Sequence, residues 1–159
     1  MEVKKLVLVY SEEIFRQWLE EKEYPYTYID QSFGTFAASF KNITKRPDYQ
    51  IVLPSIGLIA VDVKERKFYE LFQNFTIDER EINKLSSYER IFKIPVWFAI
   101  SNGNSAFTTW YWISLSYIIE QMPVRENHNT KENFRAIDIR DCITIGWDDD
   151  LGKLLKNRS

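Results

Sequence analysis

The chain has 159 residues, which is long enough for one hydrophobic core and typical of a single domain. Its 21 Lys and Arg against 23 Asp and Glu give a net charge of −2, which excludes a protein that binds nucleic acid through bulk positive charge. Hydrophobic residues make up 45% of the sequence, so the chain is expected to fold rather than remain disordered.

The sequence contains a single cysteine, Cys142, and a single histidine, His128. This excludes an intramolecular disulfide framework, a zinc finger and a metal cluster built from several histidines. Neither of the common glycine-rich phosphate-binding loops occurs, so we expect no small-molecule organic cofactor. Any metal must be held by oxygen ligands, which favours Mg²⁺ or Mn²⁺.

The N-terminal segment predicts a short strand over residues 3–10. Its apolar run from Leu6 to Tyr10 is too short for a signal-peptide core or a membrane span. We therefore expect a soluble, cytoplasmic protein with no membrane partner.

The next segments alternate between helix and strand signals. Ser11 can cap a helix that runs to about Lys22, with two acidic residues in its first turn. The stretch 26–30 is expected to be extended, and strands are predicted at 35–41 and 49–53. Residues 54–57 predict a tight turn because proline presets φ and glycine tolerates positive φ.

The strand predicted at 58–64 carries the clearest pattern. Side chains alternate between the two faces of a strand, so Ala60, Asp62 and Lys64 share one face. The other face is wholly apolar. The strand therefore ends with an acid and a base side by side.

A second helix is predicted from Thr76, with Glu79 as its capping-box partner, to about Lys93. At 100° per residue, Glu81 falls in the middle of its apolar stripe. A carboxylate in such a place is costly unless it has a partner.

The rest of the chain predicts a mixed α/β arrangement. Strands are expected at 94–100 and 106–113, strand or helix at 114–121, one or two strands within 136–145, and a short helix at 148–156. The aromatic run at 110–112 could stack unpaired bases, but a strand of this kind more often lies in a core or dimer interface. We therefore predict an α/β fold with a mixed central β-sheet flanked by helices.

Polar residues gather where two of these predicted strands begin and end. Asp48 opens the strand at 49–53, and Asp62 and Lys64 end its partner. Phosphodiester hydrolysis uses carboxylates to hold a divalent ion, which polarises the phosphate and lowers the pKa of bound water. A nearby lysine can orient the attacking water or neutralise developing charge. The carbonyl oxygen of Val63 can provide a further ligand.

This arrangement resembles the PD-(D/E)xK nuclease superfamily, which includes many restriction endonucleases and the archaeal Holliday-junction resolvases. The matching residues are Pro47-Asp48 and Asp62-Val63-Lys64, with a hairpin of suitable length between them. The resemblance covers about residues 11–101. It implies a restriction-endonuclease-like αβββαβ core, followed by a C-terminal α/β extension, about 102–159, within a single domain.

The resemblance also implies further site residues. The superfamily often has an acid on the upstream helix, where Glu12 lies closer to the apolar stripe than Glu13. On the downstream helix it often has Gln, Lys or Glu, near the position of Glu81. The expected catalytic residues are Asp48, Asp62, Lys64, Glu12 and Glu81, and the expected metal ligands are Asp48, Asp62, Val63 and Glu12.

The stretch 41–67 carries six basic and three acidic residues, a net charge of +3 in a chain of net charge −2. A basic rim around an acidic pocket suits a phosphate-backbone substrate, although a solvated hairpin surface gives the same pattern. The nucleic-acid contacts predicted here are Lys41, Lys45, Arg46, Arg66 and Lys67.

The function predicted from the sequence is a Mg²⁺-dependent DNA endonuclease in which Asp48 and Asp62 hold the metal and Lys64 assists the attacking water. Many nucleases of this type act as dimers, so a homodimer is an expectation. The main alternative is a non-catalytic subunit with the nuclease fold that binds nucleic acid or assembles a larger complex. A nuclease toxin and an RNA-directed nuclease also remain open.

Overall fold

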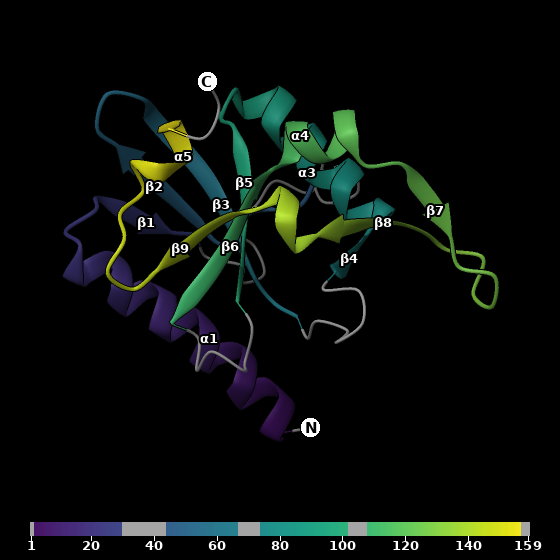
Figure 1. Ribbon diagram of the computed structural model, residues 1–159, viewed down its shortest axis with the longest axis horizontal. Coiled ribbons are helices and arrows are strands. Elements are labelled where there is room, and N and C mark those ends of the chain that lie inside the picture. Colours follow the sequence, from purple (N-terminus) through teal and green to yellow (C-terminus); the bar gives the residue numbers. More distant parts are fainter. Residues whose placement is uncertain (1, 30–43, 67–73, 102–107, 157–159) are drawn as a thin grey trace.

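The computed structural model describes residues 2–29, 44–66, 74–101 and 108–156, and a six-stranded sheet lies at its centre (Figure 1). The strand order is β1-β2-β3-β5-β6-β9. Neighbouring strands are antiparallel except for β3 and β5, which are parallel. The strands of this sheet are Tyr26–Tyr28 (β1), Tyr49–Leu53 (β2), Gly57–Glu65 (β3), Val96–Ser101 (β5), Thr109–Ser114 (β6) and Ile143–Gly146 (β9).

A second, three-stranded sheet with the order β4-β8-β7 lies beside the helices of one face (Figure 1). Its strands are Asn74–Asp78 (β4), Val124–Glu126 (β7) and Asn133–Asp138 (β8). The described α-helices are Glu2–Glu21 (α1), Glu79–Phe92 (α3), Leu115–Gln121 (α4) and Lys153–Lys156 (α5). Within the described part of the chain, no helix is both long enough and apolar enough to cross a membrane.

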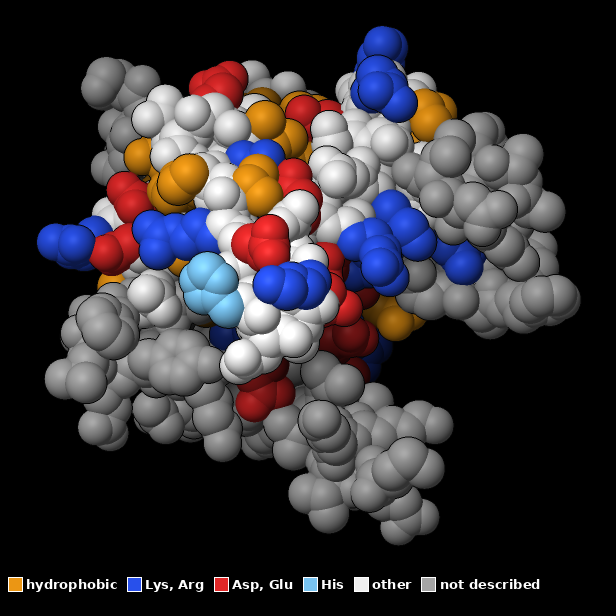
Figure 2. Space-filling view, turned by 90° about the vertical axis from the view of Figure 1, so that its right-hand side faces the viewer, with side chains coloured by type: hydrophobic (Ala, Val, Ile, Leu, Met, Phe, Trp, Pro, Cys, Tyr) orange, Lys and Arg blue, Asp and Glu red, His pale blue; other side chains and the backbone are white. Residues whose placement is uncertain are grey.

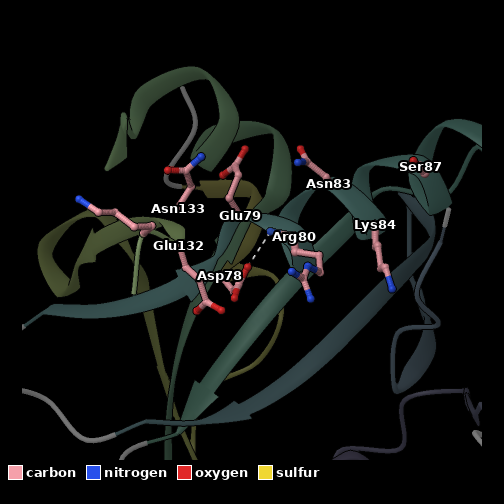
Figure 3. A pocket seen from close by; sticks show the side chains of 9 residues that line it. Asp78, Glu79, Arg80, Asn83, Lys84, Ser87, Glu132 and Asn133 are labelled. Carbon is pink, nitrogen blue, oxygen red and sulfur yellow. Dashed lines mark hydrogen bonds between the residues drawn. The ribbon is translucent and has the colours of Figure 1, made fainter. Parts of the chain in front are cut away.

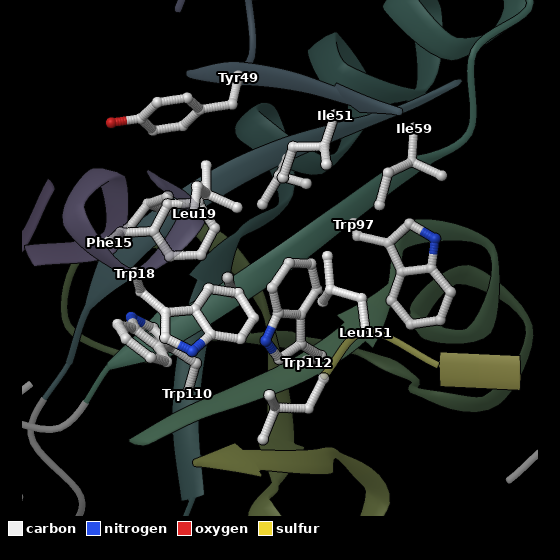
Figure 4. Packing of buried hydrophobic residues seen from close by; sticks show 14 of the residues in the cluster. Phe15, Trp18, Leu19, Tyr49, Ile51, Ile59, Trp97, Trp110, Trp112 and Leu151 are labelled. Atoms are coloured by element: carbon white, nitrogen blue, oxygen red, sulfur yellow. The ribbon is translucent and has the colours of Figure 1, made fainter. Parts of the chain in front are cut away.

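Two apolar layers enclose the central sheet. On the α1 face the core is rich in aromatic rings, and Phe15 meets Trp110 edge-on at 5.6 Å between ring centroids (Figure 4). The layer on the other face is mainly aliphatic and lies against α3 and α4. Trp110 and Trp112 are both fully buried, so these two rings belong to the core and do not form a surface for stacking bases.

The pattern predicted for β3 is confirmed. Val61 belongs to the apolar layer on the α1 face, whereas Ala60 belongs to the layer on the α3 face. The predicted turn before β3 is also present. Ser55 and Gly57 both have positive φ, at 71° and 106°, and this backbone geometry lets β2 and β3 pair directly.

The prediction of a strand at 3–10 was wrong. Residues 2–10 are part of α1, which runs without a break past Ser11, so Ser11 is a buried residue within the helix and not its cap. A short apolar run has no periodicity that distinguishes a strand from part of a helix. The strand predicted at 35–41 lies outside the described residues.

The predicted start of the second helix was also wrong. Thr76 lies in β4, where it pairs with Ala136. The helix α3 begins at Glu79, and the side chain of Asp78 caps it by accepting a hydrogen bond of 2.7 Å from the backbone N–H of Arg80. Thr76 therefore pairs in a strand with a segment about 60 residues further along the chain, and its local capping motif is not used.

The remaining segments follow the predicted order. The segment at 114–121, for which strand or helix was expected, is the helix α4, and the short strand β7 was not predicted. The succession α1, β1, β2, β3, α3, β5 matches the expected αβββαβ core, with β4 inserted before α3.

Candidate active site

Asp48 is fixed by backbone hydrogen bonds on both sides. Its N–H donates to the carbonyl of Val61 (3.0 Å), and its carbonyl accepts from the N–H of Ile29 (2.9 Å). Its side chain then accepts a hydrogen bond of 2.8 Å from the N–H of Val63. The carboxylate therefore lies directly against the backbone between Asp62 and Lys64.

Asp62 and Lys64 lie on the α3 face of β3, as their alternation predicts. Asp62 is 1% exposed, and its Oδ2 lies 2.6 Å from Nζ of Lys64. The Lys64 side chain is itself only 10% exposed, and its ammonium lies 6.0 Å from the ring centre of Phe98 on the neighbouring strand β5. The low exposure strengthens the attraction between these charges relative to a pair in water.

Glu81 has the partners that its place on an apolar helix face requires. It forms ion pairs with both Lys64 and Lys45. Nζ of Lys45 also lies 3.5 Å from Oδ2 of Asp62. Two ammonium groups therefore share the same two carboxylates, one on β3 and one on the first turn of α3.

Glu12 reaches this site from α1, on the opposite side of the sheet. Its side chain is half-buried, and burial together with the charge of Asp62 raises the pKa of Glu12 above its ordinary value. The carbonyl of Glu12 accepts a hydrogen bond of 3.2 Å from the hydroxyl of Tyr49, which anchors this part of α1 to β2. Glu13 instead pairs with Arg16 on the exposed side of the helix.

The carboxylates of the site outnumber its ammonium groups, and the pKa values show the consequence. Burial and the charge of Asp62 raise the pKa of Asp48 to about 8, against the opposing effect of the Val63 N–H. Burial would also raise the pKa of Glu81, but Lys64 and Lys45 hold it below its ordinary value. The lysines thus neutralise the Glu81 side of the site more fully than the Asp48 side.

Asp62 has unused hydrogen-bonding capacity. Both of its carboxylate oxygens are buried, and no group in the described part of the chain donates a well-directed hydrogen bond to them, although Lys64 pairs with Oδ2. Among the described residues, no three His, Cys, Asp or Glu side chains are already grouped closely enough to hold a metal ion. An ion would therefore have to draw carboxylates of this site together.

Of the other four predicted nucleic-acid contacts, the structure describes only Arg46 and Arg66. Lys41 and Lys67 lie outside the described residues. The N–H of Arg66 donates to the carbonyl of Ser101, and its guanidinium donates to the carbonyl of Glu65. Arg46 is half-buried next to Lys45.

Comparison with known proteins supports the architecture. Neither a protein-family profile nor a curated protein sequence matches the chain. Among solved structures, the chain is similar to Hjc, a Holliday junction resolvase from the archaeal hyperthermophile Archaeoglobus fulgidus, with a TM-score of 0.51 and 14% identity. The match covers 82% of this chain and 87% of the resolvase. The chain has the restriction-endonuclease-like fold. The fold that the Pro-Asp and Asp-x-Lys residues implied is thereby confirmed.

A surface hollow lies apart from the carboxylate site. It is a groove of about 600 Å³ between the start of α3 and the hairpin of β7 and β8 (Figure 3). Acidic and basic side chains are intermixed over this face of the molecule (Figure 2). The groove is lined by Asp78, Glu79, Arg80, Asn83, Lys84, Ser87, Lys131, Glu132 and Asn133. Its mixed charge gives no preference for a polyanion.

Two side chains near the start of α3 have contacts that were not recognised from the sequence. Lys45 was expected only on a nucleic-acid rim, yet it pairs with the site carboxylates. Arg135 was not singled out at all, although it contacts Glu79 at the start of α3. The position of Lys45 three residues before Asp48 is a local signal, whereas nothing near Arg135 in the sequence indicates its partner.

Proposed function

We propose that this protein is a Mg²⁺-dependent endonuclease that hydrolyses phosphodiester bonds of DNA. The observation that carries the proposal is the meeting of Asp48, Asp62 and Lys64 at the β2–β3 pair, in a fold of the restriction-endonuclease-like type. The similar archaeal protein is a Holliday junction resolvase, which supports DNA as the class of substrate.

The donor set fits a hard divalent cation. Asp48 and Asp62, with Glu12 and the carbonyl oxygen of Val63, would hold Mg²⁺ or Mn²⁺. The raised pKa values of Asp48 and Glu12 and the free capacity of the Asp62 oxygens support this, because clustered carboxylates that lack enough counter-charge favour a cation. A bound ion would polarise the phosphate and lower the pKa of a bound water.

In this proposal, protein side chains orient the attacking water and stabilise the developing charge. Hydrolysis adds the hydroxyl group of water to phosphorus, breaks one P–O bond and transfers the remaining proton to the departing sugar oxygen. Lys64 donates a hydrogen bond that orients the attacking water and offsets the charge developing on the phosphate. Asp62 and Glu81 keep the Lys64 ammonium in place.

The proposal also covers the domain organisation, the DNA contacts, the oligomeric state and the location of the protein. We propose that residues 1–159 act as one domain, since β6 and β9 of the C-terminal extension complete the central sheet. Basic residues at 41, 45, 46, 66 and 67 would contact the DNA backbone. A homodimer would provide one site for each strand of a duplex, and a DNA substrate agrees with the cytoplasmic location expected from the sequence.

A cleavage assay tests the function. Purified protein is incubated with supercoiled plasmid, linear duplex, a four-way junction, single-stranded DNA and RNA, in Mg²⁺, in Mn²⁺ and in EDTA. We expect cleavage in either metal, none in EDTA, and a loss of at least about 1,000-fold in Asp62→Ala and about 100-fold in Lys64→Ala.

Glu21→Ala is the matched control, because Glu21 is an exposed acid at the end of α1. It should cleave at the wild-type rate. Cleavage that survives in Asp62→Ala would reveal a contaminating nuclease or a different site. If wild-type protein binds these substrates but cleaves none of them, the non-catalytic alternative replaces the proposal.

A further inference from the structure

Lys45 occupies a place in the site that a peripheral DNA contact does not require. Its ammonium forms an ion pair with Glu81 and lies 3.5 Å from Oδ2 of Asp62. These are the same two carboxylates that Lys64 contacts. Burial would lower the pKa of Lys45, but the charges of Asp62 and Glu81 raise it above its ordinary value, so the side chain is fully charged at neutral pH.

The two lysines differ in their freedom to move. The Lys64 side chain is 10% exposed and extends from the middle of the sheet, whereas the Lys45 side chain is 37% exposed and precedes β2. An exposed ammonium on a flexible four-carbon stem can exchange one anionic partner for another at little cost. A substrate that approaches from solvent would therefore meet Lys45 more readily than Lys64.

We propose that Lys45 is a second catalytic lysine, which binds a non-bridging oxygen of the scissile phosphate. In the absence of metal and DNA, Lys45 acts as a counter-ion for Asp62 and Glu81. With a divalent cation held by the site carboxylates, the Lys45 ammonium would be free to bind the phosphate, whose negative charge grows as water attacks. This inference rests on the proposed nuclease function and adds a residue to it.

The arrangement has a consequence that does not depend on cleavage. Lys45 and a metal ion both lower the electrostatic energy of Asp62, so they compete for the same carboxylate. Removal of the lysine charge should therefore tighten metal binding. A lysine that only touches DNA outside the site would leave metal affinity unchanged.

The test compares Lys45→Met, Lys45→Arg and the control Lys22→Met. Lys22 follows α1 about ten residues from Glu12, roughly 15 Å along a helix, so its variant removes the same charge away from the site. Mn²⁺ binding is measured by calorimetry without DNA. Cleavage of a four-way junction and of plasmid is measured at saturating DNA and metal. Thermal unfolding in EDTA confirms that each variant is folded.

We expect Lys45→Met to bind Mn²⁺ about fivefold more tightly and to lose about 100-fold in kcat, with KM for DNA within threefold of wild type. Lys45→Arg should keep at least about a tenth of the wild-type kcat, and Lys22→Met should match wild type in every measurement. An unchanged kcat with a raised KM would overturn the proposal and return Lys45 to the DNA-binding rim.

Weaker Mn²⁺ binding in Lys45→Met, together with equal loss of kcat in Lys45→Arg, would also overturn it, since that pattern indicates a purely structural role. These failures differ from failure of the nuclease function itself. In that case wild-type protein would cleave none of the substrates, while the calorimetry would still report whether Lys45 competes with the metal.

Discussion

Two acidic residues in the first turn of α3 lie two positions apart but belong to clusters that differ in charge balance. Glu79 faces Arg135, whose guanidinium makes two hydrogen bonds to it, of 2.7 and 3.0 Å. The same guanidinium donates to the carbonyls of Ile118, Ile119 and Met122, the last of which follows α4. Glu81 faces a site where four carboxylates share two lysines.

The difference shows how one helix turn can serve both structure and chemistry. Side chains two residues apart on a helix diverge by about 200°, so Glu79 and Glu81 belong to different environments. Around Arg135, the charges balance and the donors have acceptors, including the carbonyls of Ile119 and Met122 at the C-terminal end of α4. Around Asp62, negative charge is in excess and hydrogen-bonding capacity is unused. A balanced cluster stabilises the fold, whereas an unbalanced one can bind a cation.

Breaking the balanced cluster should have the largest effect on stability. Arg135→Met should lower the free energy of unfolding by about 3 kcal/mol, because it leaves the largely buried Glu79 without its partner and removes the nitrogen that donates to three carbonyls at the end of α4. Urea unfolding in EDTA measures this. Glu79→Gln, which keeps a hydrogen-bonding group, should cost less than Arg135→Met, and a wild-type midpoint for Arg135→Met would contradict a stabilising role.

Relieving the unbalanced cluster should stabilise the metal-free protein, by a smaller amount. The raised pKa of Asp48 means that the folded state holds a proton that the unfolded state loses above about pH 4, so stability falls as pH rises from there to about 8. Asp48→Asn removes this penalty and can still accept the hydrogen bond from Val63. We expect its Tm in EDTA to exceed that of wild type by roughly 5–10 °C at pH 6, and by little at pH 4.

The same pair of proteins provides a control for this prediction. With saturating Mg²⁺ or Mn²⁺, wild type should recover stability and Asp48→Asn should gain less, because one ligand has lost its charge. A difference in Tm that is constant from pH 4 to pH 8.5 would show that the Asp48 carboxyl has an ordinary pKa.

The smallest effect on stability is expected at a solvated ion pair. Its variant provides a baseline for the stability changes at Arg135 and Asp48. Glu13 and Arg16 pair on the exposed side of α1, with side chains 39% and 47% exposed. Water screens such a pair, so Glu13→Gln should change Tm by no more than about 1 °C. A larger loss in thermal unfolding would mean that this pair belongs to a wider network.

The sequence anticipated the elements whose pattern is local. The alternation of Ile59, Val61 and Val63 with Asp62 and Lys64 identified β3 and the face that carries its charged residues. The acid in the apolar stripe of α3 indicated a buried partner, and Glu81 has two. The start of α3 was misplaced because β4 pairs with β8, and no local signal reports a strand partner so distant in sequence.

Periodicity and residue type by themselves determined the central strands, the turn between β2 and β3, and an acid and a base at the end of β3, because side-chain alternation and turn geometry depend on neighbouring residues alone. Only the tertiary structure decided that α1 begins at Glu2, that Lys45 reaches Asp62 and Glu81, and that Arg135 joins α4 to α3. These contacts depend on how distant segments pack, and the excess of carboxylates over lysines becomes a property of the site only once burial brings their charges together.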